Sequence, residues 1–222
     1  YKLFKHNKDL KPKELLIKIK KLLPKHLNSI PDNAAISIFE TIKKTKRKNL
    51  MLETGAGVST IAMFLGSYIY NKKFYTFEVS SEKISAIKQI INESICENLK
   101  INISDYWIPI CRNSLCDYAG IKSLKDLNKN FDFAFFDSEH NLNHLLQEIK
   151  GFTNLSSDNF FIGIDDAHMN YKKVNIDYVN LIRTKAGLKK ILIKNNLSKE
   201  FYLEIYNHFK LQNYKIKIIK PY

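Results

Sequence analysis

LMLETGAGVST, residues 50–60, carries the clearest structural signal in the sequence. An apolar run ends in Glu53, two glycines then flank Ala56, and Ser59 and Thr60 lead into a second apolar run. Glycine permits a tight turn with positive φ and lets the backbone approach a ligand closely. Serine and threonine can cap a following helix, whose first N–H groups are unpaired. The pattern predicts a buried strand, a glycine turn and the N-terminus of a helix.

Short apolar runs alternate with longer stretches along the rest of the chain. The runs that we predict as strands are 49–53, 73–78, 106–111, 131–136, 159–164, 189–194 and 214–220. The stretches long enough for helices are 59–70, 81–98, 114–127, 141–150 and 173–186. Apolar strands that alternate with helices are typical of a parallel sheet covered on both faces. The sequence therefore predicts an α/β fold: a doubly wound, mostly parallel seven-stranded sheet with helices on both faces.

Two further helices are predicted before the first strand. Leucine and isoleucine recur at helical spacing over 14–27 and again over 31–44. We expect residues 1–48 to form a helical extension packed on a main domain of residues 49–222.

The net charge of +14 is concentrated at the two ends of the chain. Residues 1–50 carry a net charge of +10 and residues 172–222 a net charge of +9, whereas residues 51–171 carry −5. Basic flanks can attract a polyanion such as nucleic acid. They can also be solvated helix faces, which we favour because no aromatic-interleaved basic motif accompanies the charge.

Composition restricts the class of protein and its compartment. The chain is 45% hydrophobic and 26% charged, and it contains no run of about 18 apolar residues that could span a bilayer. Its three cysteines show no C-x-x-C spacing, so neither a disulfide framework nor a zinc site is indicated. A soluble protein of the reducing cytoplasm is expected.

The second predicted strand ends in Glu78, 21 residues after Gly57. A carboxylate at that place can accept hydrogen bonds from the hydroxyls of a ribose. A nicotinamide dinucleotide and S-adenosylmethionine both fit this arrangement. The dinucleotide fingerprint needs a third glycine where this chain has Thr60, and it has no use for Glu53. The residues favour S-adenosylmethionine, and the alternative is a strand–helix turn that binds nothing.

Three motifs resemble those of class I S-adenosylmethionine-dependent methyltransferases. ETGAGVST (53–60) is similar to their first motif, E-x-G-x-G-x-S-T. FDFAFFDSEHNLNHLLQEI (131–149) and NFFIGIDDAH (159–168) resemble the fourth- and fifth-strand motifs of the branch that contains small-molecule and macrocin-type sugar O-methyltransferases. The resemblance covers about residues 31–170.

The resemblance implies which residues bind the cofactor. Glu53, Gly55 and Gly57 would line its methionine and sulfonium end, Glu78 would hold the ribose, and Asn113 with Ser114 would lie beside the adenine. The sequence Arg-Asn-Ser at 112–114 departs from the Gly-Asp-Ser that is usual in the family. The full predicted set is Glu53, Gly55, Ala56, Gly57, Ser59, Thr60, Glu78, Asn113, Ser114 and Asp137.

Asp137, Asp165 and Asp166 follow the ends of the fourth and fifth predicted strands. Carboxylates gathered at one rim repel one another unless protons or a cation compensate, and oxygen ligands suit Mg²⁺ or Mn²⁺. These three positions match the metal ligands of metal-assisted O-methyltransferases by resemblance, although the carboxylates could instead bond loop amides or cap a helix. His140 and His168 are the candidate general bases, and the alternative is that both are surface histidines without a catalytic role.

The predicted function is metal-assisted O-methylation of a hydroxyl on a small-molecule or saccharide acceptor, with S-adenosylmethionine as methyl donor. Two alternatives stay open. One is a metal-independent nucleic-acid methyltransferase whose basic flanks hold phosphates. The other is a non-catalytic module that binds the cofactor or a partner and has kept only the fold.

Overall fold

The computed structural model describes residues 11–46, 48–139 and 142–165. Five strands form one parallel sheet in the order β3-β2-β1-β4-β5. They are β1 (Leu50–Thr54), β2 (Phe74–Phe77), β3 (Trp107–Ile110), β4 (Phe131–Phe136) and β5 (Ser156–Ile164). The strand order reverses beside β1, which is the topological switch point where doubly wound sheets bind ligands. The predicted fold class is confirmed. The strands predicted at 189–194 and 214–220 lie outside the described residues.

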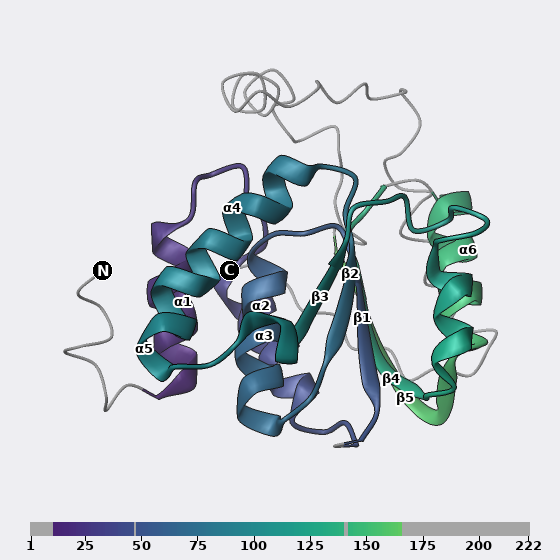
Figure 1. The fold of residues 1–222 in the computed structure, drawn as a ribbon, viewed down its shortest axis with the longest axis horizontal. Helices are drawn as coiled ribbons and strands as arrows, with labels where there is room; N and C mark the ends of the chain where they lie inside the picture. Colours follow the sequence, from purple (N-terminus) through teal and green to yellow (C-terminus); the bar gives the residue numbers. More distant parts are fainter. Residues whose placement is uncertain (1–10, 47, 140–141, 166–222) are drawn as a thin grey trace.

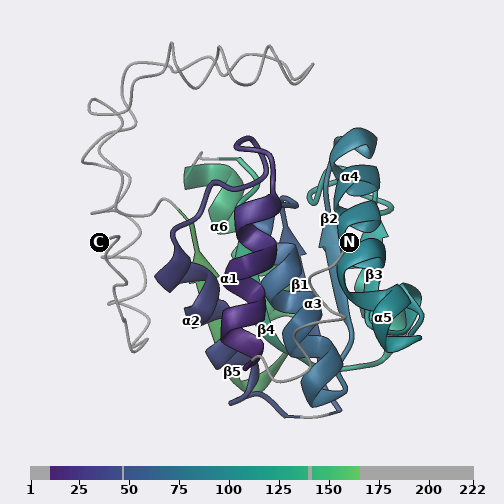
Figure 2. The same ribbon diagram turned by 90° about the vertical axis from the view of Figure 1, so that its left-hand side faces the viewer.

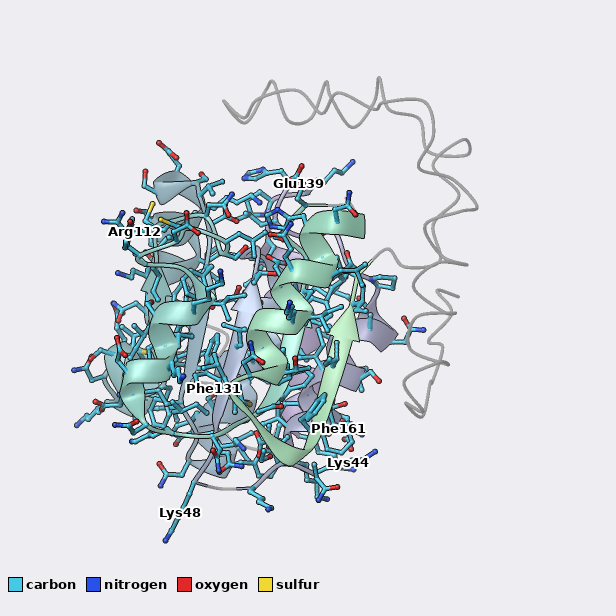
Figure 3. All side chains as sticks on the ribbon, turned by 90° about the vertical axis from the view of Figure 1, so that its right-hand side faces the viewer. Lys44, Lys48, Arg112, Phe131, Glu139 and Phe161 are labelled. Atoms are coloured by element: carbon cyan, nitrogen blue, oxygen red, sulfur yellow. The ribbon has the colours of Figure 1, made fainter. Side chains whose placement is uncertain are left out.

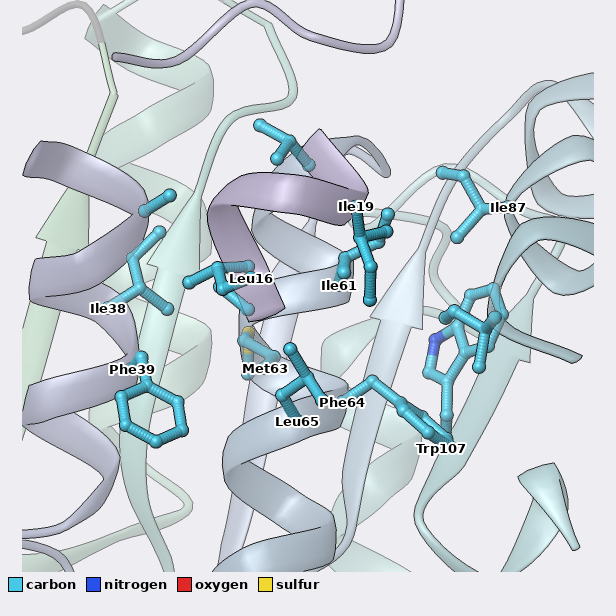
Figure 4. Packing of buried hydrophobic residues seen from close by; sticks show 14 of the residues in the cluster. Leu16, Ile19, Ile38, Phe39, Ile61, Met63, Phe64, Leu65, Ile87 and Trp107 are labelled. Carbon is cyan, nitrogen blue, oxygen red and sulfur yellow. The ribbon is translucent and has the colours of Figure 1, made fainter. Parts of the chain in front are cut away.

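One face of the sheet is covered by the helices of the first hundred residues (Figures 1 and 2). They are α1 (Pro12–Leu22), α2 (Asp32–Ile42), α3 (Val58–Tyr70), α4 (Ser81–Ile91) and α5 (Glu97–Leu99), and a π-helical turn, Asn92–Cys96, joins the last two. Leu16 of α1, Phe64 of α3 and Trp107 of β3 belong to one buried cluster (Figure 4). Every residue of 58–67 is buried, because α3 lies between the sheet and the two N-terminal helices. Helices α1 and α2 therefore share the core of the sheet.

The other face is covered by α6 (Leu142–Thr153) and a 3₁₀ segment, Ile121–Leu127. Leu145, Ile149 and Phe152 of α6 pack in a second buried cluster with residues of β1 and β4. The helix predicted over 114–127 is wrong in its first half. The N–H of Ile121 donates to the carbonyl of Ser114 at 2.8 Å, which closes a compact loop in place of a helical turn.

A buried ion pair fastens the end of the molecule where the strands begin. Lys72 Nζ lies 3.2 Å from Asp132 Oδ1, and both side chains are almost fully buried. The same ammonium donates to Thr45 Oγ1 at 2.6 Å, and the N–H of Lys46 donates to Asp132 Oδ2 at 2.6 Å. These contacts hold the connection between α2 and β1 against the sheet. Among the described ranges, no helix has the length and apolarity to cross a membrane.

Candidate functional site

The predicted site residues gather where the strands end. Figure 3 shows Arg112 and Glu139 at that end of the molecule and Lys44 and Lys48 at the opposite end. Thr54, the last residue of β1, pairs with the last residues of β2 and β4, and Phe136 of β4 pairs with Ile164 of β5. Because the strands are parallel and in register, the residues that follow them share one rim. The structure thereby brings together Gly55, Glu78, Asp137 and Asp165.

Gly55 and Gly57 serve different purposes in the turn. Gly55 has a φ of 79°, and a Cβ added there would lie 1.8 Å from the carbonyl oxygen of Asp137. Only glycine fits this position, because the turn passes directly against the backbone that follows β4. Gly57 has an extended φ of −177°, and an added Cβ would meet only the carbonyl oxygen of Leu27, at 3.4 Å. The close approach of the turn therefore depends on Gly55.

The amide groups of the turn are already paired within the protein. The N–H of Gly55 donates to the Phe77 carbonyl at 2.8 Å, and the N–H of Ala56 donates to Glu78 Oε2 at 3.0 Å. Gly57 and Val58 continue the series, and their N–H groups donate to Thr60 Oγ1 at 3.0 Å and to the Leu27 carbonyl at 2.9 Å. Four consecutive amides thus have internal acceptors, and the last acceptor, Leu27, lies between α1 and α2.

Glu53 is fully buried beneath the turn. Its Oε2 accepts hydrogen bonds from Thr60 Oγ1 at 2.9 Å and from Thr76 Oγ1 at 2.7 Å. Among the described residues no group hydrogen-bonds to Oε1, and the same holds for the buried hydroxyl of Ser59. Burial raises the pKa of Glu53 to about 7, against the opposing effect of the hydroxyls of Ser59, Thr76 and Thr60.

Glu78 joins the turn to the segment after β2. Besides Ala56, it accepts from the N–H of Ser80 at 2.9 Å and from Lys83 Nζ at 3.3 Å. A carboxylate offers about four lone-pair sites, so these three bonds leave room for one hydroxyl donor. Val79, the next residue, is 69% exposed and offers an apolar surface at the same rim.

Asp137 and Asp165 both line a pocket between the ends of β4 and β5 and helix α6. The other residues that line it are Phe136, Ser138, Glu139, Leu145, Glu148 and Ile164. The N–H of Asp165 donates to the Phe136 carbonyl at 3.0 Å, which keeps the two aspartates on adjacent strand ends. Asp166, His140 and His168 lie outside the described residues. Within the described residues, no three His, Cys, Asp or Glu side chains are placed to hold a metal ion together.

Asn113 and Ser114, predicted beside the adenine, lie in the loop after β3. Asn113 is exposed, and its Oδ1 accepts from the N–H of Leu115 at 2.8 Å. Ser114 is buried, and its hydroxyl donates to Glu148 Oε1 at 2.5 Å. The same carboxylate oxygen accepts from Ser138 Oγ at 2.7 Å and contacts His144 Nε2 at 3.3 Å.

Reasoning from the sequence missed Glu148, Ser138 and the structural importance of His144. A signal for Glu148 was present. With Leu145, Ile149 and Phe152 it occupies the inward stripe of α6, where an acidic residue is buried only with partners. Those partners are 10 and 34 residues away in the sequence, so no local pattern could identify them.

Comparisons with known proteins agree with the fold. No protein-family model matches the chain. The structure resembles that of the O-methyltransferase from Bacillus cereus in complex with SAH (S-adenosylhomocysteine). The TM-score is 0.50, and 18% of residues are identical over 83% of this chain and 81% of that one. It also resembles the SAH-bound Podospora anserina methyltransferase PaMTH1, with a TM-score of 0.51 and 16% identity over 93% of this chain and 82% of that one.

Among curated proteins, the chain is 34% identical over 101 residues to an uncharacterized FAD-dependent oxidoreductase of Methanocaldococcus jannaschii. The match covers 41% of this chain and 17% of that protein. The chain therefore spans less than a fifth of the length of this relative. The parallel order β3-β2-β1-β4-β5, the helices on both faces and the two solved structures together identify the Rossmann-like fold of the class I methyltransferases.

Proposed function

We propose that the protein is an S-adenosylmethionine-dependent methyltransferase that transfers the methyl group to a hydroxyl of a small-molecule or saccharide acceptor. The observation that carries the proposal is the paired state of the glycine turn. A dinucleotide such as NAD or FAD places its pyrophosphate on unpaired N–H groups at a helix N-terminus. Here the amides of residues 55–58 already have acceptors inside the protein. S-adenosylmethionine carries no phosphate and needs no such groups.

The cationic end of the cofactor suits the buried acid of the turn. S-adenosylmethionine has an ammonium group and a sulfonium group, and Glu53 Oε1 has no hydrogen-bond partner among the described residues. A buried carboxylate oxygen without a partner is costly, and an ammonium donor would satisfy it. Glu78 has room for a ribose hydroxyl, which supports the assignment of the nucleoside end to β2.

Methyl transfer requires that the acceptor oxygen be held in line with the carbon–sulfur bond. When bound, S-adenosylmethionine supplies the methyl group: the S–CH₃ bond breaks as the O–CH₃ bond forms, and the sulfonium becomes a neutral thioether. Asp137, Ser138 and Asp165 line the rim beside the glycine turn, where the acceptor hydroxyl would lie. The acceptor hydroxyl must also lose a proton, and His140 and His168 remain the proposed bases.

The pocket between the ends of β4 and β5 contains two of the three ligands proposed for a divalent cation. Asp137 and Asp165 stand on adjacent strand ends and line the same pocket, which supplies two of the three proposed oxygen ligands, with Asp166 as the third. Mg²⁺ held there would lower the pKa of a coordinated hydroxyl.

Transfer of a labelled methyl group tests the proposal. Wild-type protein would be incubated with methyl-labelled S-adenosylmethionine and separate panels of sugars, phenols and RNA, each with Mg²⁺ and with EDTA. We expect label in a sugar or phenol and loss of the signal with EDTA. Methyl transfer that continues in EDTA would exclude the proposed role of the metal and would still support a methyltransferase. Label in RNA alone would establish the nucleic-acid alternative. Absence of transfer to every panel, together with absence of cofactor binding, would overturn the proposal.

A further inference from the structure

Glu148 is a buried carboxylate on which three segments of the chain converge. Its side chain is 1% exposed, and its Oε1 accepts from the hydroxyls of Ser114 at 2.5 Å and Ser138 at 2.7 Å. His144, one turn earlier in α6, places Nε2 at 3.3 Å from the same oxygen. Burying a carboxylate is unfavourable unless hydrogen bonds compensate, so this arrangement has a physical cost that needs an explanation.

Helix α6 fixes Glu148 in place. Leu145, Ile149 and Phe152 lie on the same face and pack into the cluster formed with β1 and β4. The residue at 148 therefore cannot turn to solvent without displacing that apolar face. His144 is held as well, because its Nδ1 lies 3.2 Å from Glu139 Oε2.

The two serines come from opposite sides of the proposed cofactor site. Ser114 lies in the compact loop after β3, whose ends are joined by the bond from the Ile121 N–H to the Ser114 carbonyl. Ser138 follows Asp137, and a Cβ on Gly55 would lie 3.2 Å from its backbone nitrogen. One carboxylate oxygen thus joins the loop proposed to contact the adenine to the segment against which the glycine turn packs.

Glu148 also lines the small pocket beside Asp137 and Asp165, at the rim proposed for the acceptor hydroxyl. Its Oε1 has three neighbours with polar hydrogen-bonding groups, and a carboxylate oxygen has two lone pairs. This oxygen is therefore occupied in holding the protein together, and it is not available to take a proton from an acceptor.

We infer that Glu148 is a positioning residue, which sets the loop after β3 and the segment after β4 in the one arrangement that binds S-adenosylmethionine. The inference rests on the proposed function. Glu148 acts through Ser114 and Ser138. Cofactor binding therefore requires an acceptor oxygen at position 148 more than it requires the charge or the volume of the side chain.

The test compares two substitutions of nearly equal size by calorimetric titration with S-adenosylhomocysteine. Glu148→Gln keeps an acceptor oxygen for the two hydroxyls, whereas Glu148→Met keeps the volume and removes every acceptor. We expect Glu148→Gln to bind within about threefold of wild type and Glu148→Met to bind about tenfold more weakly, as loss of a charge-assisted hydrogen bond implies. A residue that only fills space would give the reverse order or no difference.

Single serine variants provide a second, milder measurement. Ser114→Ala should weaken binding less than Glu148→Met, because it removes only one of the two hydroxyl bonds to the carboxylate. The double variant should bind no more weakly than Glu148→Met, because that substitution already removes the Ser114 bond. Ser156→Ala is the matched control, since that hydroxyl donates to the Thr153 carbonyl at the other end of α6. All titrations are made below the unfolding temperature of each variant.

The outcomes separate this inference from the proposed function. Wild-type protein that fails to bind S-adenosylhomocysteine and S-adenosylmethionine would overturn both. Binding by wild type, with unchanged affinity in folded Glu148→Met and Ser114→Ala, would overturn the role of Glu148 alone.

Discussion

The carboxylate of Glu53 and the indole of Trp107, on strands separated by β2, are joined through a single hydroxyl group. Trp107 Nε1 donates to Thr76 Oγ1 at 2.8 Å, and Thr76 Oγ1 donates to Glu53 Oε2 at 2.7 Å. Thr60 continues the series to the glycine turn, because its hydroxyl bonds Glu53 and accepts from the N–H of Gly57. The chain contains one tryptophan, so its fluorescence reports on this network without any label.

The first prediction concerns the pH dependence of cofactor binding. Because the pKa of Glu53 is raised to about 7, the carboxyl titrates near neutrality, and its ionised form attracts the ammonium of the cofactor. We expect the affinity for S-adenosylmethionine to increase as the pH rises from about 6 to about 8, with a parallel change in Trp107 fluorescence. Glu53→Gln should abolish both effects. A wild-type affinity that is constant over this range would contradict the assignment of Glu53 to the cationic end.

The same carboxyl affects stability with a defined sign. Its pKa in the folded state lies above the unfolded value of 4.5, so its contribution is fully present below pH 4.5 and is lost as the pH rises through about 7. The size of this contribution is about 3 kcal/mol. Urea unfolding at several pH values should show a smaller decline for Glu53→Gln than for wild type. An equal decline in both proteins would mean that Glu53 ionises normally.

Gly55 and Gly57 provide a matched pair of substitutions. Gly55→Ala places a Cβ 1.8 Å from the Asp137 carbonyl at a positive φ, whereas Gly57→Ala meets only one atom at 3.4 Å. We expect Gly55→Ala to lose at least about 2 kcal/mol of unfolding free energy and most of its cofactor affinity. Gly57→Ala should remain close to wild type. Equal effects in thermal unfolding and calorimetry would show that the turn is not held against β4.

Breaking the ion pair of Lys72 and Asp132, which lies far from the site, should strongly lower the free energy of unfolding. Lys72→Met leaves the carboxylate of Asp132 buried without its cation, which costs about 3–5 kcal/mol. Lys13→Met breaks an exposed pair with Glu40 and should cost less than about 1 kcal/mol. Denaturant unfolding of the two variants measures the difference. Cofactor affinity at low temperature should be unchanged in both, because neither residue is near the rim.

His144 predicts a separate pH effect. Its hydrogen bond with Glu148 raises its pKa above the model-peptide value of 6.5, against the opposing effect of burial. The stabilisation of the folded state by protonated His144 is therefore complete below pH 6.5, and it is lost as the pH rises through the higher pKa of the folded state. The free energy of unfolding of wild type, minus that of His144→Gln, should fall over this window. A difference that does not change with pH would mean that the imidazole stays neutral between its two glutamates.

The sequence predicted the sheet well because parallel strands buried on both faces leave a plain apolar signature. The run at 131–136 is β4 with the same bounds, and the run at 73–78 is β2 shortened by one residue at each end. The glycine turn was predicted equally well, since only glycine can occupy position 55, where φ is positive and the backbone lies against Asp137. The loop at 114–120 was not, because its bonds close turns within the loop and extend no helix.

The site was predicted only in part, for a physical reason. Glu53 lies near the end of β1 and Glu78 directly follows β2, and strand ends can be located from hydrophobicity alone. The partners of Glu53 on β2 and of Glu148 after β3 are determined by packing between distant segments. The pairing of the Val58 amide with the Leu27 carbonyl likewise depends on how the segment between α1 and α2 packs. That pairing is one of the four that distinguish this turn from a dinucleotide site.

The most direct measurement is calorimetric titration of the wild-type protein with S-adenosylmethionine, NAD and FAD in separate experiments. The paired amides at 55–58 predict saturable binding of S-adenosylmethionine and no binding of either dinucleotide. Saturable binding of NAD or FAD, without binding of S-adenosylmethionine, would show that the glycine turn is a dinucleotide site and would contradict the proposed methyltransferase function.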